Sequence, residues 1–192
     1  LQLAEKVKAA KALSERLYER RYAAGCMEFN RVEARAILDD QGAPTGIRYR
    51  KRTEATKLIE EAMILANHFV ASWLSERSMP CIYRTHDAPA RDALFSFYEI
   101  LQEFDAYRTI DKNLFCAGNP HVLQQLLATP ADEQTHELVS MLLLRSMKRA
   151  AYSVEDAGHY GLALEQYCHF TSPIRRYPDL MVHRMVKEAL LK

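Results

Sequence analysis

HFTSPIRRYPDLMVHR, residues 169–184, is the most informative segment of the sequence. Pro173 ends any strand that precedes it, because proline fixes φ and donates no backbone hydrogen bond. Pro178 opens a final helix, since proline is favoured in the first helical turn. Arg175 and Arg176 come just before that helix, where a planar guanidinium and free backbone N–H groups both suit a phosphate. From these residues alone, phosphate binding and ion pairing with neighbouring acids are equally supported.

The hydrophobic pattern outside this stretch predicts an α+β fold that is mostly helical. Apolar residues recur at helical spacing in the first turns of the chain, which predicts an opening helix that ends near Gly25. Alternating residues on both sides of the turn at 39–42 predict a β-hairpin. Further helices are predicted at residues 56–75, 90–104, 121–127, 133–150 and 178–192, with a short strand at 81–84.

The helix at 56–75 is predicted to bury one apolar stripe. The members of this stripe are Ile59, Ala62, Met63, Ala66, Phe69, Val70 and Trp73. The sequence contains no repeat, linker or low-complexity tract, so we expect residues 1–192 to contain no internal domain boundary.

Composition and charge narrow the possible classes of protein. Hydrophobic residues make up 48% and charged residues 27% of the chain, as in ordinary soluble globular proteins. The net charge of +1 excludes a strongly basic nucleic-acid binder and leaves only local basic patches. The four cysteines lack the spacing of a zinc site, and we expect them to be reduced and buried. No apolar run is long enough to span a bilayer, so no membrane partner is expected.

The string at residues 169–184 resembles the signature of the ribonuclease II/ribonuclease R family, whose members share an RNB-type catalytic domain. Residues 58–67 resemble the mid-domain helix of that family, and residues 83–87 resemble its R-x-H-D strand end. Residues 143–164 are similar to the run before the signature, and residues 176–179 follow the ribonuclease R branch. The resemblance implies the mostly helical C-terminal half of such a catalytic domain, so we expect the chain to be a piece of a longer protein.

The resemblance also implies an activity and its cofactor. Members of the family hydrolyse single-stranded RNA processively from its 3′ end and release nucleoside 5′-monophosphates with Mg²⁺, a hard ion held by carboxylate oxygens. The family's metal-binding aspartates form a cluster near the start of the domain, and no D-x-x-x-x-x-D-x-D-D run occurs here. We therefore expect the Mg²⁺ ligands to precede Leu1, no metal site among residues 1–192, and no cleavage by this part alone. Cold-shock and S1-type domains in the parent polypeptide and a cytoplasmic location are further expectations from the family.

Three functional positions of the family match residues of this chain. Arg175 matches the catalytic arginine that grips the scissile phosphate and stabilises charge in the transition state. Glu60 matches the glutamate that accepts a hydrogen bond from a ribose 2′-hydroxyl near the 3′ end. Phe29 matches an aromatic residue that stacks on bases upstream. An ion pair of Glu60 with Lys57, a one-residue shift in favour of Glu61, and a core position for Phe29 are the structural alternatives.

Residues beside Arg175 complete the predicted RNA-binding set. Arg176 and Ser172 belong to the signature itself, and Tyr167 precedes it, where its ring could stack on a base or pack in the core. Asp179 could orient Arg175 or cap the last helix, and we favour the cap. The alternative function is a catalytically inactive RNA-binding or regulatory module derived from such a nuclease.

Overall fold

The chain folds into a mostly helical α+β structure with two small antiparallel sheets, which confirms the predicted fold class. It is a computed structural model that describes residues 2–29, 33–50 and 52–191. The α-helices are α1 (Gln2–Ala23), α2 (Glu54–Ser75), α3 (Arg91–Leu101), α4 (Lys112–Cys116), α5 (Pro120–Ala128), α6 (Glu133–Ser146) and α7 (Tyr177–Leu191). The strands are β1 (Glu33–Leu38), β2 (Pro44–Arg50), β3 (Tyr83–Thr85) and β4 (Ala151–Ser153), and the short 3₁₀ helices are η1 (Asp105–Tyr107) and η2 (Tyr160–Leu162).

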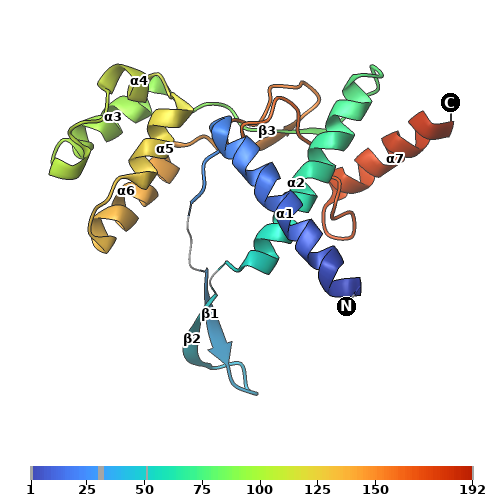
Figure 1. Cartoon of the computed structure of the whole chain (residues 1–192), viewed down its shortest axis with the longest axis horizontal. Helices are drawn as coiled ribbons and strands as arrows, with labels where there is room; N and C mark the ends of the chain where they lie inside the picture. The colour runs from blue at the N-terminus through green and yellow to red at the C-terminus, as the bar shows by residue number, and fades with distance from the viewer. Residues whose placement is uncertain (1, 30–32, 51, 192) are drawn as a thin grey trace.

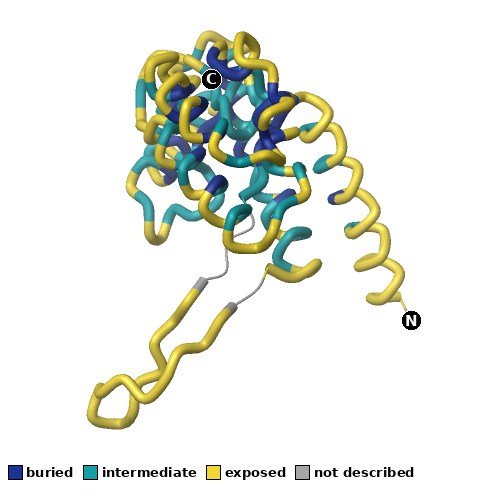
Figure 2. The backbone as a smooth tube through the Cα atoms, turned by 90° about the vertical axis from the view of Figure 1, so that its left-hand side faces the viewer, coloured by how far each residue is buried: buried dark blue, intermediate teal, exposed yellow. Residues whose placement is uncertain are grey.

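The predicted hairpin is present and extends away from the body of the molecule (Figure 1). Strands β1 and β2 pair with Ala36 opposite Ile47, and the Asp39 carboxylate closes the turn by accepting the backbone N–H of Ala43 at 2.8 Å. Figure 2 shows the hairpin exposed along its described length. Val32, which also fits the alternating pattern, lies outside the described residues.

Helix α2 forms as predicted, but the prediction of which face of the helix is buried is wrong. None of its seven members is fully buried, and Phe69 is 63% exposed. The buried positions are instead Glu61, Asn67, Ala71 and Leu74. Glu61 and Asn67 are buried because each has a polar partner far away in the sequence, which local hydrophobic periodicity does not reveal.

Helices α3 to α6 enclose the larger hydrophobic core. Leu94, Leu101, Phe115 and Leu123 are fully buried there. The helix predicted over 133–150 ends at Ser146, because Met147 adopts an extended backbone and the chain continues into β4. Likewise the helix predicted over 90–104 ends at Leu101 and is followed by η1. The short helix α4 and strand β4 were not predicted.

A second, smaller core joins α2, β3, the segment before the signature, and α7. Its buried members are Ala71, Leu74, Cys81, Tyr83, Cys168 and Val182. All four cysteines of the chain are free and buried, as predicted. Cys168 donates its thiol hydrogen to the carbonyl of Asn67 at 3.3 Å, so the chain immediately before the signature is fixed to α2.

Candidate functional site

A cleft of about 280 Å³ lies between α1, α2, the segment at 26–29 and the chain around the signature. Four of the six predicted site residues line it: Phe29, Glu60, Tyr167 and Arg176. These residues come from four separate parts of the sequence, so only the fold brings them together. The cleft is therefore the candidate functional site.

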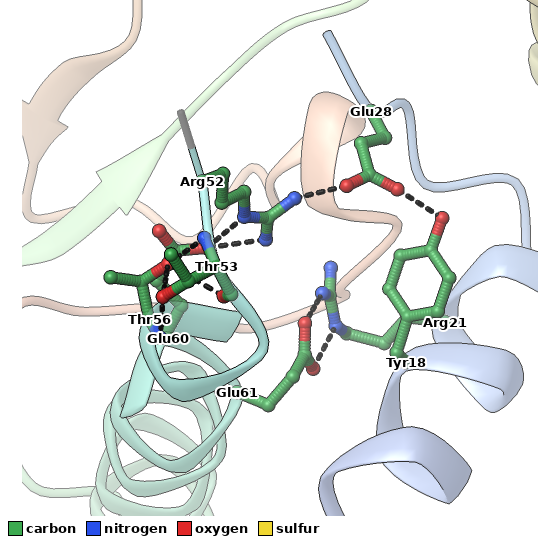
Figure 3. Close-up of polar contacts among 8 residues, drawn as sticks. All are labelled: Tyr18, Arg21, Glu28, Arg52, Thr53, Thr56, Glu60 and Glu61. Atoms are coloured by element: carbon green, nitrogen blue, oxygen red, sulfur yellow. Dashed lines mark hydrogen bonds and ion pairs between the residues drawn. The ribbon is translucent and has the colours of Figure 1, made fainter. Parts of the chain in front are cut away.

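Glu60 is held at the rim of this cleft by an arginine rather than by the lysine considered above. Arg52 Nε donates to Glu60 Oε2 at 2.7 Å, and its Nη2 also contacts this oxygen (Figure 3). The same guanidinium pairs through Nη1 with Glu28 Oε1, while the Tyr18 hydroxyl donates to Glu28 Oε2. Burial, followed by the Glu28 contact, raises the pKa of Tyr18, so its hydroxyl remains a donor.

Glu61 occupies a different environment from its neighbour. Its side chain is 3% exposed and forms an ion pair with Arg21 of α1, in which Arg21 Nε donates to Glu61 Oε2 at 3.2 Å. The Glu60 side chain is 42% exposed and lines the cleft. Glu61 thus joins α1 to α2, whereas Glu60 is the carboxylate that an incoming molecule can reach.

Arg176 is fixed by a buried carboxylate. Asp179 Oδ1 accepts a hydrogen bond from Arg176 Nη2 at 2.8 Å and one from the backbone N–H of Ser172, also at 2.8 Å. Asp179 is fully buried in the first turn of α7. The preferred prediction that Asp179 caps this helix is wrong, because the N–H that it accepts belongs to the preceding turn. Its ion-pair partner is Arg176 rather than Arg175, and Asp179 reaches Arg175 only through the backbone of the turn at Ser172.

Arg175 and Ser172 lie beside the cleft rather than in its lining. The Arg175 side chain is exposed, and in the described ranges no ion pair to it is found. Ser172 is half-buried, and its carbonyl accepts the backbone N–H of Arg175 at 3.3 Å. The fold therefore positions Arg175 on a tight turn next to the cleft, with its charge available to a ligand.

Asn67 fixes the path of the signature, and sequence reasoning missed it. Its Nδ2 donates to the Tyr167 hydroxyl at 3.0 Å, while its Oδ1 accepts the backbone N–H groups of Phe170 at 2.9 Å and Thr171 at 3.2 Å. A single asparagine within the apolar run of α2 is the signal that could have identified it, because a buried amide needs partners.

Tyr167 and Phe29 both combine packing with exposure to the cleft. Tyr167 is 7% exposed, burial raises the pKa of its hydroxyl, and its ring packs edge-on against His159 and His169. Phe29 is half-buried and packs against the larger core. The packing roles considered from the sequence are thus present, and an RNA-stacking role for either ring stays a prediction.

Two half-buried histidines, His159 and His169, pack against the ring of Tyr167. Burial, followed by the charge of His86, lowers the pKa of His159 to about 4. Burial, followed by the charge of Arg176, lowers the pKa of His169 to about 4. Neutral His159 accepts the backbone N–H of Leu162 through Nδ1 at 3.2 Å, and a protonated ring could not accept this hydrogen bond.

The carboxylates around the cleft do not fit a divalent cation. Glu28 and Glu60 share Arg52, and Glu61 pairs with Arg21. Across residues 2–29, 33–50 and 52–191, no three His, Cys, Asp or Glu side chains are grouped so that they could hold a metal ion. Each of these three glutamates is thus paired with an arginine. A separate finding concerns membranes: no helix among the described residues is long and apolar enough to cross one.

Comparison with known proteins identifies the family. The model of the RNB domain matches residues 1–192. The chain belongs to the RNB domain family. Ribonuclease R from Aquifex aeolicus is 39% identical over 188 residues, which are 98% of this chain and 26% of that protein. This RNB chain therefore spans about a quarter of the length of that relative.

Solved structures show the same RNB fold. A Mycoplasma genitalium ribonuclease R in complex with ribose methylated single-stranded RNA superimposes with a TM-score of 0.84 at 29% identity, covering 95% of this chain and 28% of that one. The yeast protein Ssd1, a pseudonuclease, gives a TM-score of 0.54 at 27% identity, covering 71% of this chain and 17% of that one. The resemblance to ribonuclease R that the signature indicates is confirmed, and the chain corresponds to part of the catalytic domain.

Proposed function

We propose that this chain is part of a processive 3′→5′ exoribonuclease, and that its cleft holds the 3′-terminal region of single-stranded RNA. The observation that carries the proposal is the assembly of Phe29, Glu60 and Arg176 around one cleft, with Arg175 on the adjoining turn. An aromatic ring, a carboxylate and two guanidinium groups match the base, the ribose and the phosphates of one strand. The ribonuclease R complex with ribose methylated RNA supports this choice of ligand.

Each group has a chemical role in the proposal. Glu60 accepts a hydrogen bond from a 2′-hydroxyl, which DNA lacks, so it favours RNA over DNA. Arg176 contributes positive charge from a fixed position, because Asp179 holds its guanidinium. Phe29 stacks on a base, a contact that tolerates any sequence. Arg175 binds the phosphate at the scissile end and stabilises the charge that develops there.

The Mg²⁺-dependent part of the reaction belongs, in this proposal, to acids outside the described residues. The carboxylates at the cleft are paired with arginines and do not form a metal site. This part of the protein accordingly supplies RNA grip and transition-state charge, and no cleavage is expected from it alone.

The second candidate function is an RNA-binding module without catalysis. The specific observation in its favour is the structural similarity to Ssd1, a pseudonuclease. Both candidates require the same cleft and differ only in whether the full-length protein cuts RNA.

A timed degradation assay with Mg²⁺ and a single-stranded RNA labelled at its 5′ end separates the two candidates. The full-length protein is compared with its Arg175→Ala variant and with Arg108→Ala, which removes an exposed arginine paired with Asp105. We expect stepwise shortening from the 3′ end, a rate reduced roughly 100-fold to 1,000-fold by Arg175→Ala, and little change in the control. RNA binding without shortening would favour the inactive module.

A further inference from the structure

Arg52 links the base of the hairpin to the candidate site. Its guanidinium lies between Glu28, which precedes β1, and Glu60 of α2 (Figure 3). The Arg52 side chain is 31% exposed and the Glu28 side chain 20%, so the arrangement is partly shielded from water. One arginine thus contacts a carboxylate on each side, and all three side chains line the cleft.

The residue that follows Arg52 caps helix α2. Thr53 caps α2 through a reciprocal pair of hydrogen bonds with Thr56: the Thr56 N–H donates to the Thr53 hydroxyl at 3.3 Å, and the Thr53 N–H donates to the Thr56 hydroxyl at 2.8 Å. This capping box fixes the backbone of Thr53, the residue next to Arg52. On the opposite side, the Tyr18 hydroxyl holds Glu28.

Arg52 contacts only one of the two carboxylate oxygens of Glu60. Both the 2.7 Å hydrogen bond from Nε and the ion pair from Nη2 fall on Oε2. Among the described residues, none donates a hydrogen bond to Oε1. A two-point contact from a planar guanidinium also restricts rotation of the carboxylate. Oε1 is thereby left as an oriented acceptor at the rim of the cleft.

We propose that Arg52 is a positioning residue for RNA recognition, which fixes the Glu60 carboxylate so that Oε1 accepts the ribose 2′-hydroxyl. This inference rests on the proposed function of Glu60. In it, Arg52 sets the orientation in which the Glu60 carboxylate meets the ribose. A lysine could neutralise Glu60 but could not contact it through two adjacent N–H groups, because an ammonium lacks the planar fork.

The test is a double-mutant cycle in the full-length protein. Wild type, Arg52→Gln, Glu60→Gln and the double variant are each assayed on a single-stranded RNA and on its counterpart with 2′-deoxy sugars in the last several nucleotides. The readout is the ratio of the apparent affinities for these two oligonucleotides. A merely structural role for Arg52 would weaken binding of both strands alike. Arg52→Lys tests partial rescue, and Arg108→Gln is the matched surface control.

We expect Arg52→Gln to reduce the ratio roughly fivefold or more, in the range of coupling between contacting residues. We expect no further reduction when it is added to Glu60→Gln, and partial recovery with lysine. An unchanged ratio in Arg52→Gln would overturn the inference while leaving Glu60 in its role. The same conclusion would follow if the double variant showed the full reductions of both single variants combined. An unchanged ratio in Glu60→Gln itself would refute the role of Glu60, and Arg52 would then have nothing to position.

Discussion

Asp179 accepts a hydrogen bond from Arg176 at 2.8 Å inside the first turn of α7, where the carboxylate is fully buried. The same oxygen accepts the backbone N–H of Ser172, so one side chain fixes both the arginine at the cleft and the turn that carries Arg175. Removing one member of a buried ion pair leaves the other charge uncompensated, which is more costly than the net value of the pair.

Asp179→Ala is therefore expected to destabilise the protein by about 3–5 kcal/mol. Asp179→Asn retains an oxygen acceptor for the Ser172 N–H but loses the charge, and we expect an intermediate loss. Urea unfolding followed by circular dichroism measures both variants. A loss below about 1 kcal/mol for Asp179→Ala, the level of a surface ion pair, would contradict the role assigned to this carboxylate.

Asn67→Ala is expected to destabilise the protein by about 3 kcal/mol. The substitution removes the donor to the Tyr167 hydroxyl and the acceptor of the backbone N–H groups of Phe170 and Thr171. The free energy of unfolding measures this loss. Asn113→Ala is the matched control, since Asn113 is an exposed residue of α4. Similar stability in the two variants would show that Asn67 does not hold the signature in place.

Phe29→Ala is expected to weaken binding of single-stranded RNA by about 1–3 kcal/mol, the usual value of one base stacked on an aromatic ring. Phe95→Ala, which truncates a 48% exposed phenylalanine on α3, is the control. Fluorescence anisotropy with a short labelled RNA reports the dissociation constants. Equal affinities for Phe29→Ala and the control would assign Phe29 to the core alone.

Stability is expected to fall in mild acid because of His159. Burial lowers the pKa of His159 from 6.5 to about 4, so between these values the unfolded chain binds more protons than the folded one. The stabilisation is complete above about pH 6.5 and is lost progressively as the pH falls toward 4. Urea unfolding at pH 7.5 and at pH 5 gives the free energy of unfolding at each pH. Between these pH values, that free energy should fall by on the order of 1–2 kcal/mol more in wild type than in His159→Gln. An equal pH dependence would assign the effect to other groups, such as His169.

The sequence predicts the elements of this fold better than the faces that they bury. The long helices follow from apolar spacing and from proline boundaries, and the hairpin follows from alternation around a turn at 39–42. The buried face of α2 does not follow, because Glu61 and Asn67 are buried by partners that lie 40 and 100 residues away. Pairings of that length depend on the tertiary structure, and periodicity within one helix does not contain them.

The candidate site shows the same division. The resemblance to ribonuclease R indicates Glu60, Phe29 and the signature arginines, and three of these line the cleft. Arg52 ends a run of basic residues around Tyr49 at positions 48–52, a pattern that suits RNA contact and a solvated strand edge equally well. Its contact with Glu60 depends on where the chain returns after the hairpin, which the spacing of residues does not specify.

Photo-crosslinking measures most directly whether RNA occupies the cleft. A single-stranded RNA with 4-thiouridine near its 3′ end is bound to the full-length protein, irradiated and digested, and the crosslinked peptides are identified by mass spectrometry. Crosslinks at residues 26–29 or 160–176, which are reduced by Phe29→Ala, are the predicted result. Crosslinks confined to helices α3 to α6, with none on the segments that line the cleft, would show that RNA does not bind in this cleft.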